Sequence, residues 1–266
     1  MQTWLCASCS TQFPASESPP AECPICQDAR QYVPVEGQRW TTMEALRSSH
    51  RAEIRDELPG LLGIGCKPEF AIGQRALLVP TGGGNVLWDC QALLDDEIVS
   101  AVEERGGLEA IAISHPHYYS TMVEWARTFD CPILIHEDDR KWVMRPDPSV
   151  EPWSGEVNEL APGATLLRLG GHFAGGQVLH WAERKLLLSG DIVQVIPDRK
   201  FVSFMYSYPN LIPLPPDTVD EITRRLEPWD FDSIVGAWWG RVVYDGKEAV
   251  RRSAHRYRDA IEGRLG

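Results

Sequence analysis

Two histidines one residue apart, His115 and His117, stand in the stretch "ISHPHYYST", directly after the apolar run "LEAIAIS". The run predicts a buried strand, and side chains alternate between faces in an extended chain, so both imidazoles are expected to point the same way. His172 lies in the glycine-flanked stretch "LGGHFAGG", and Asp191 ends the apolar run "KLLLSGD". Layered α/β folds assemble sites at strand ends and in the following loops, so these four residues predict one metal site.

A second set of metal-type residues lies near the N-terminus, in the spacing C-x2-C-x13-C-x2-C. Each Cys-x2-Cys turn presents two thiolates to one tetrahedral ion, so the quartet predicts a structural zinc site of the knuckle or ribbon type, or an iron site of the rubredoxin type. The surrounding segment has few apolar residues, and metal binding is expected to supply its folding energy. Such segments also dock protein partners. The four cysteines are Cys6, Cys9, Cys23 and Cys26.

The chain divides by composition into three parts. Residues 1–35 hold the quartet and form what we call the four-cysteine segment. Residues 36–65 are expected to be a linking helix, which a capping box of Thr41 and Glu44 opens and which runs to about Leu58. Residues 66–266 are expected to form the main domain.

Within the main domain, short strands alternate with helices. Strands are predicted at 75–80, 85–90, 108–114, 131–137, 165–171, 176–183, 184–191 and 231–238, and helices at 94–107, 120–129, 217–227 and 247–266. The stretches 145–162 and 197–217, rich in proline and aromatic residues, are predicted to be surface loops that wall the site.

The order of these motifs resembles that of the metallo-β-lactamase-fold superfamily. Asp89 at a strand end is followed by "SHPHYYS", "LGGHFAGGQVL", "LLLSGD" and "IVGAWWG", so the resemblance spans residues 66–243. It implies an α/β (α+β) fold of the αββα type, in which two mixed sheets pack face to face with helices outside, here with the small metal-binding four-cysteine segment added at the N-terminus. The family's metal lies at one edge of that sandwich.

By the family's pattern, His115, His117 and His172 correspond to a three-histidine metal position, and Asp191 corresponds to a carboxylate that bridges two metals. The first motif of the family is H-x-H-x-D-H. Here Tyr119 replaces its aspartate and Ser120 its second-metal histidine, while Trp239 stands where a later histidine is expected. Tyrosine and serine are poor neutral ligands, and tryptophan cannot ligate. The sequence therefore predicts at most one metal in the His site.

Three imidazoles and a carboxylate suit zinc, and two histidines with Asp191 also suit non-haem Fe(II), as in the superfamily's persulfide dioxygenases. A bound metal with an open position would bring the pKa of its water towards about 7 and polarise an ester, thioester or phosphoryl oxygen. Asp191 is expected to act in catalysis, with Tyr119 donating a hydrogen bond to a developing oxyanion. The expected pocket residues are Asp89, Ser120, Trp239 and Arg241.

Three functions follow from this set of residues. The first is a metal-dependent hydrolase acting on a small, anionic ester, thioester or phosphoester. The second is a non-catalytic binding or scaffold protein with a degraded site, in which the four-cysteine segment docks a partner. The third is a mononuclear Fe(II) dioxygenase.

The composition narrows the partners and the location. The formal net charge of −12 disfavours general binding to nucleic acid. There is no apolar run of about 18 residues and no basic start followed by an apolar segment, so we expect neither a membrane span nor a secretory signal, and we expect a cytoplasmic location. The remaining partner classes are a small-molecule substrate or ligand and a protein partner bound through the four-cysteine segment.

Overall fold

Two mixed β-sheets form the centre of the structure, a computed structural model that describes residues 1–265. The first sheet has the order β3-β4-β5-β6-β7-β8-β9. Its strands are antiparallel from β3 to β6 and parallel from β6 to β9. They are β3 (Arg51–Leu58), β4 (Leu61–Lys67), β5 (Ala76–Thr81), β6 (Gly84–Trp88), β7 (Ala110–Ala112), β8 (Ile133–His136) and β9 (Val150–Trp153).

The second sheet has the order β10-β11-β12-β13-β18-β19. All of its neighbouring strands are antiparallel except β13 and β18, which run parallel. The strands are β10 (Val157–Ala161), β11 (Ala164–Arg168), β12 (Gln177–Trp181), β13 (Leu186–Gly190), β18 (Ser233–Gly236) and β19 (Val242–Tyr244).

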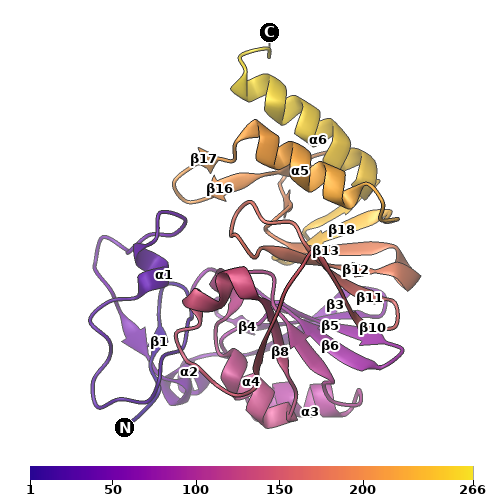
Figure 1. The fold of residues 1–266 in the computed structure, drawn as a ribbon. Helices are drawn as coiled ribbons and strands as arrows, with labels where there is room; N and C mark the ends of the chain where they lie inside the picture. Colours follow the sequence, from indigo (N-terminus) through magenta and orange to yellow (C-terminus); the bar gives the residue numbers. More distant parts are fainter. Residues whose placement is uncertain (266) are drawn as a thin grey trace.

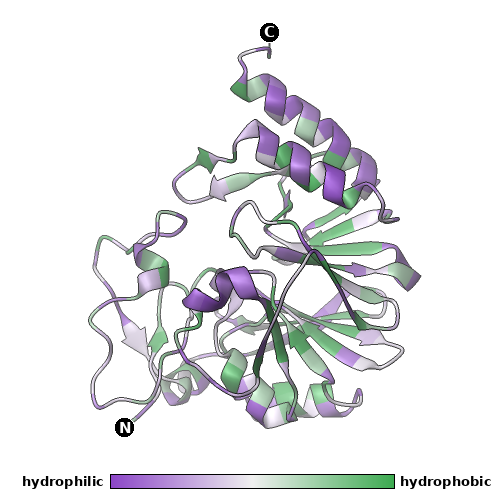
Figure 2. Cartoon of the chain, viewed as in Figure 1, coloured by the Kyte–Doolittle hydropathy of each residue, from purple (hydrophilic) through white to green (hydrophobic). Residues whose placement is uncertain are grey.

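Helices cover the outer faces of both sheets (Figure 1). Those on the first sheet are α2 (Met43–Ser49), α3 (Asp96–Glu103) and α4 (Met122–Phe129); those on the second are α5 (Pro216–Leu226) and α6 (Gly246–Ile261). Each helix layer buries apolar side chains against its own sheet, and a third apolar cluster lies between the sheets (Figure 2). The predicted αββα sandwich is confirmed. None of the helices within residues 1–265 is long and apolar enough to cross a membrane.

The predicted linking helix is wrong over most of its length. Helix α2 is capped by Thr42, whose Oγ1 accepts a hydrogen bond from the Ala45 amide at 3.2 Å, and it ends at Ser49. Residues 51–67 form the β3–β4 hairpin, so the first sheet begins at Arg51 rather than near residue 66. Strand β3 is an edge strand rich in charged residues. Its pairing with β4, which the local sequence does not reveal, overrides helix propensity.

The two stretches predicted to be surface loops also contain strands. Residues 145–162 contain β9 and β10, which are edge strands of the two sheets, and the second stretch contains β15 (Val202–Ser203), β16 (Met205–Ser207) and β17 (Ile212–Pro213). Strand β15 pairs with β14 (Gln194–Val195), and β16 pairs with β17. Short edge strands tolerate proline and charge, which weakens the alternation that identifies a strand.

The four-cysteine segment packs against the sandwich. The chain up to the start of α2 contains β1 (Leu5–Cys6), α1 (Pro24–Gln27) and β2 (Trp40–Thr41). The Gln12 amide donates to the Ser120 carbonyl oxygen at 3.0 Å, and the Gln74 side chain donates to Ser10 Oγ at 3.0 Å. Phe13 and the cysteines share an apolar cluster with Trp142 of the main domain. This face of the segment is therefore occupied by contacts within the chain itself.

A buried ion pair joins the first sheet to the turn after β18. Arg75 Nε lies 3.0 Å from Glu57 Oε2, and both side chains are 1% exposed. The guanidinium also donates to the Gly236 carbonyl oxygen at 2.9 Å, and Glu57 accepts from the Gly240 amide at 2.9 Å. The pair thus ties β3 of one sheet to the end of β18 in the other.

Replacing Glu57 with Ala is expected to lower the free energy of unfolding by about 3–5 kcal/mol, because it leaves the Arg75 guanidinium buried and unpaired. The control is Glu53→Ala on the same strand. Glu53 pairs with Lys67 and Arg55, whose side chains are half exposed, so its loss should cost less than about 1 kcal/mol. Chemical denaturation measures both values, and equal losses would contradict the assignment.

Candidate metal centre

The structure brings His115, His117, His172 and Asp191 together. One ligand atom from each lies within 4.8 Å of the other three, and all four residues are buried. The first two follow β7, His172 lies in the turn between β11 and β12, and Asp191 directly follows β13. Three separate connections at one edge of the sandwich therefore supply the cluster.

The local backbone differs from the extended chain expected around the first two histidines. His115 itself is extended (φ −172°, ψ 173°), but Pro116 begins a 3-10 turn, Pro116–Tyr118, that contains His117. The two imidazole rings nevertheless lie 5.0 Å apart, and those of His115 and His117 lie 4.9 and 5.1 Å from the ring of His172. The tight turn, rather than strand alternation, sets their common direction.

Two glycines at this edge allow a backbone conformation and a close contact that other residues would not. Gly171, next to His172, has φ +83°, a left-handed conformation that strains other residues. Gly190 precedes Asp191, and a Cβ there would lie 2.6 Å from Ser114 Oγ. Any side chain at Gly190 would therefore separate Asp191 from the loop that carries His115.

Hydrogen bonds orient the histidine rings. His172 Nδ1 lies 2.7 Å from the Tyr206 carbonyl oxygen and donates to it, which leaves Nε2 free to ligate. His115 Nδ1 lies 3.0 Å from Ser114 Oγ. His115 Nε2 lies 3.1 Å from Asp191 Oδ1, and within residues 1–265 neither atom has a hydrogen-bond partner. These two buried polar atoms are thus in contact, but without the geometry of a hydrogen bond.

Burial also sets the charge of the cluster. It lowers the pKa values of His115 and His117 well below the ordinary value, and that of His172 to about 4, so the rings are neutral, as metal ligation requires. Burial, and then the charge of Asp89, raise the pKa of Asp191 to about 8. A cation within the cluster would oppose that shift. Three nitrogens and one oxygen fit zinc or another divalent transition metal.

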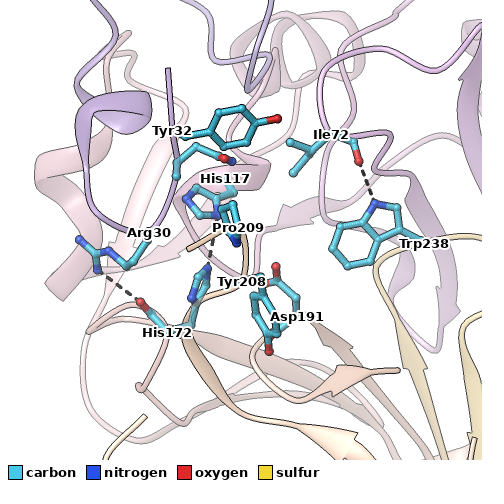
Figure 3. Close-up of a pocket in the computed structure, with 10 residues that line it drawn as sticks. Arg30, Tyr32, Ile72, His117, His172, Asp191, Tyr208, Pro209 and Trp238 are labelled. Carbon is cyan, nitrogen blue, oxygen red and sulfur yellow. Dashed lines mark hydrogen bonds between the residues drawn. The ribbon is translucent and has the colours of Figure 1, made fainter. Parts of the chain in front are cut away.

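A cavity of about 150 Å³ opens onto this cluster (Figure 3). His117, His172 and Asp191 contribute to it from the cluster, and Tyr208, Pro209 and Trp238 contribute from later loops. The remaining lining residues are Arg30, Gln31, Tyr32 and Ile72. Three of these four, Arg30, Gln31 and Tyr32, come from the four-cysteine segment. The spacing of the cysteines predicted a metal-binding segment but did not indicate that it lines the cavity.

The expected pocket residues lie elsewhere in the structure. Among the described residues, Asp89, Ser120, Trp239 and Arg241 are absent from the lining of this cavity. Trp238, not Trp239, faces it. The Trp239 ring lies over β4, where a Cβ on Gly63 would come within 2.3 Å of it. Arg241 lines a neighbouring cavity together with Trp238, so neither Trp239 nor Arg241 faces the cluster as expected.

Tyr119, which was expected to donate a hydrogen bond in the site, does not face the cavity. The Tyr119 hydroxyl lies 3.5 Å from the Asp139 carbonyl oxygen, and Tyr119 is not among the cavity residues of the described chain. Tyr118 instead packs its ring 4.8 Å from His115. The Tyr118 hydroxyl is buried and, within residues 1–265, has no hydrogen-bond partner. Because of the 3-10 turn, Tyr118 rather than Tyr119 packs against the cluster.

Asp89 does not belong to the cluster, but it holds the backbone next to His115. Its Oδ1 accepts a hydrogen bond from the Ser114 amide at 2.7 Å, one residue before His115. The residue is buried and has φ +61°. Burial raises the pKa of its carboxyl to about 7, against the lowering effect of the Ser114 hydrogen bonds.

The four cysteines of the N-terminal segment also converge. Cys6 Sγ lies 3.5 Å from Cys26 Sγ, and Cys9 Sγ lies 3.7 Å from Cys23 Sγ. Bonds of about 2.3 Å to a tetrahedral zinc ion place sulfur atoms about 3.8 Å apart. Hydrogen bonds from the thiols of Cys23 and Cys26 lower the pKa of Cys6, so a thiolate is favoured there. The cluster fits a closed four-sulfur ion site.

No family model matches the chain. The uncharacterized protein YmaE of Bacillus subtilis (strain 168) is 47% identical over 271 residues, which cover 100% of this chain and 99% of YmaE. The chain belongs to the family of YmaE.

Solved structures show the fold of this YmaE-family chain. The metallo-β-lactamase from Pontibacter korlensis matches with a TM-score of 0.59 and 13% identity, over 79% of this chain and 100% of that one. FIM-1 from Pseudomonas aeruginosa, in a mono-zinc form, matches with a TM-score of 0.58 and 14% identity, over 79% and 96%. A metallo-β-lactamase family protein of Thermus thermophilus gives a TM-score of 0.52 and 16% identity, over 78% and 82%. The metallo-β-lactamase fold inferred from the motifs is confirmed.

Changing Cys9 to Ser is expected to remove one equivalent of metal per chain, because the site is left with only three thiolate ligands. Metal analysis of the purified protein measures the loss. Cys131→Ser is the control, since Cys131 is buried far along the chain and outside both clusters. Unchanged metal content in the Cys9 variant would refute the assignment.

Asp89→Asn is expected to change the pH dependence of stability. A carboxyl in the unfolded chain titrates near about 3.9, so the folded state, with the pKa of Asp89 at about 7, holds more protons between these values. The free energy of unfolding of the wild type therefore falls as pH rises through that window. Asparagine keeps the acceptor for the Ser114 amide and tolerates positive φ, but does not ionise.

The Asp89→Asn variant should gain up to about 4 kcal/mol relative to wild type between about pH 4 and pH 7. Denaturation at several pH values measures the difference. Asp96→Asn, at an exposed position of α3, is the control and should leave the slope as in wild type. Parallel curves for wild type and Asp89→Asn would contradict the argument.

Proposed function

We propose that this chain is a metal-dependent hydrolase that holds one metal in its His site and acts on a small ester, thioester or phosphoester. The observation that carries the proposal is the set of buried ligand atoms without partners in the described chain, His115 Nε2 and Asp191 Oδ1, beside two further neutral imidazoles at the edge of a cavity. The mono-zinc form of FIM-1, which shares the fold, supports a single-metal site.

A divalent metal bound here would supply Lewis acidity and would acidify a water for attack. The residues of the chain then have distinct tasks. We assign to Asp191, which belongs to the cluster and lines the cavity, the task of accepting or orienting a proton. Tyr208 fixes its backbone, since its hydroxyl donates to the Asp191 carbonyl oxygen at 2.8 Å.

The cavity limits what the substrate can be. The cavity volume of about 150 Å³ is below the ~300–1,000 Å³ typical of pockets that enclose a whole drug-sized ligand, so a small substrate is favoured. Tyr32, Pro209 and Trp238 give it apolar and aromatic walls, and Arg30 lines it with its guanidinium paired to Asp28. These walls favour a small group with an apolar part.

A non-catalytic scaffold is the second candidate. It is favoured by Tyr119, Ser120 and Trp239, which replace the second-metal ligands. Against it, the four-cysteine segment is docked on its own main domain and lines the cavity, so it is not presented as a free partner-binding module.

His172→Ala is expected to lower the metal content from two equivalents per chain to one and to abolish nearly all hydrolysis, because one imidazole leaves the proposed reactive centre. Esters, thioesters and phosphodiesters form the substrate panel. His255→Ala, at an exposed position of α6, is the matched control and should behave as wild type.

Equal background rates for wild type and the His172 variant, across the panel, would overturn the hydrolase proposal in favour of the scaffold. Analysis of the bound metal separates the hydrolase from the Fe(II) dioxygenase. Zinc with hydrolysis supports the proposal, whereas iron with consumption of O₂ contradicts it.

A further inference from the structure

We propose that the ion of the four-cysteine site organises the His site, with Arg30 as the positioning residue that connects them. The segment that leaves the cysteine cluster, residues 28–32, contributes one wall of the cavity. The inference rests on metal occupancy of the His site, as proposed above, and adds that this occupancy depends on the four-cysteine segment.

The first link runs from the cysteines to Arg30. Cys26 lies in α1, which ends at Gln27. Asp28 then forms a two-pronged pair with Arg30, with Oδ1–Nε at 2.5 Å and Oδ2–Nη2 at 2.8 Å, and the Arg30 amide also donates to Asp28 Oδ1 at 3.0 Å. The side chains of Arg30 and Asp28 are largely buried, 12% and 18% exposed. Such a bidentate pair fixes the direction of the guanidinium.

The second link runs from Arg30 to the histidines (Figure 3). Arg30 Nη1 donates to the His172 carbonyl oxygen at 3.3 Å. The guanidinium also lies 3.9 Å from the centre of the Phe173 ring. That ring in turn lies 5.4, 5.0 and 5.1 Å from the rings of His115, His117 and His172. Arg30 therefore holds both the backbone of one ligand and the aromatic ring that all three imidazoles pack against.

The third link fastens the same segment to the loop near Asp191. Asn210 Nδ2 donates to the carbonyl oxygens of Ala29 and Gln31, at 2.9 and 3.1 Å. Two residues before it, Tyr208 donates to the Asp191 backbone. Residues 29–31 are thus tied to the loops that position two of the four ligands, His172 and Asp191.

The four-cysteine segment depends on its ion for this arrangement. Its own apolar cluster is small, with Phe13 and Ile25 beside the four cysteines. Four buried sulfurs without a cation do not replace a hydrophobic core, so ion binding supplies much of the segment's folding energy. Loss of that ion should release residues 28–32, and with them the support of His172 and the cavity wall.

Titration with cobalt(II) tests this link in protein that keeps zinc in the four-cysteine site. The d–d absorption of cobalt bound by nitrogen and oxygen reports the His site, and zinc analysis reports the four-cysteine site. Arg30→Ala is expected to weaken cobalt binding at the His site by about 10–100-fold, the usual effect of losing a residue that orients a ligand. It should also change the d–d spectrum and retain the zinc bound by the cysteines.

Two further variants test whether Arg30 acts by positioning the His site, rather than by its charge or through a general effect of losing an arginine. Arg30→Lys keeps the charge but loses the two-pronged pair and the planar contact with Phe173, so it should resemble Arg30→Ala rather than wild type. Arg251→Ala, which removes a half-exposed arginine on α6, is the control and should bind cobalt as wild type does.

Cys26→Ser is expected to weaken the His site in the same direction. Combined with Arg30→Ala it should weaken the site no further, because both changes break one path. If Cys26→Ser unfolds the chain, as circular dichroism would show, the Arg30 variants still carry the test, since they keep all four cysteines.

Wild-type affinity and an unchanged spectrum in Arg30→Ala would overturn this inference and leave the proposed function standing. Failure of the wild type itself to bind cobalt outside the four-cysteine site would overturn the metal-dependent function, and this inference with it. Weaker binding in both Arg30 variants, with normal binding in Arg251→Ala, is the result that supports the link.

Discussion

Burial of three imidazoles and one carboxylate within 4.8 Å of one another is the constraint on which this edge of the sandwich depends. A buried polar atom without a partner costs about 1–3 kcal/mol. In the described chain His117 Nε2 is such an atom, and His115 Nε2 and Asp191 Oδ1 contact each other at 3.1 Å without hydrogen-bond geometry. Added imidazole protons do not relieve the cost, because burial disfavours the charged rings and lowers their pKa values. A divalent cation would satisfy all four ligand atoms at once, so the geometry of this edge suits cation binding.

The surrounding chain keeps these ligands together by short, directional contacts. Asp89 holds the amide before His115, Gly190 allows β13 to reach Ser114, and the Tyr206 carbonyl fixes the ring of His172. Each contact joins two different connections of the sandwich. Because strands β7 and β13 lie in different sheets, the ligand cluster and the packing of the two sheets support each other.

The fold and the four-residue cluster could be predicted from sequence because their determinants are local. Strand ends, glycine-flanked turns and the His-x-His spacing are all visible along the chain, and together they mark the four residues Asp191, His172, His115 and His117. The β3–β4 hairpin was missed because strand β3 is a charged edge strand whose pairing partner, not its own composition, decides its conformation. Tyr119 and Trp239 were expected at the site because of their places in the resembling motif, but the 3-10 turn and the turn after β18 direct Tyr118 and Trp238 towards it instead. The contribution of Arg30 and Tyr32 to the cavity follows no spacing rule at all, because it depends on how the four-cysteine segment docks.

The four-cysteine segment docks on the loop that follows His117. Ser120, which replaces a second-metal histidine in the family's pattern, has φ +40° and offers its carbonyl oxygen to the Gln12 amide at 3.0 Å. The Gln12 side chain then donates to Glu124 in helix α4 at 3.1 Å. In this chain the short loop after His117 therefore serves to seat the four-cysteine segment. The loop after His117 therefore has two structural tasks, since it follows a member of the His cluster and also holds the docked four-cysteine segment in place.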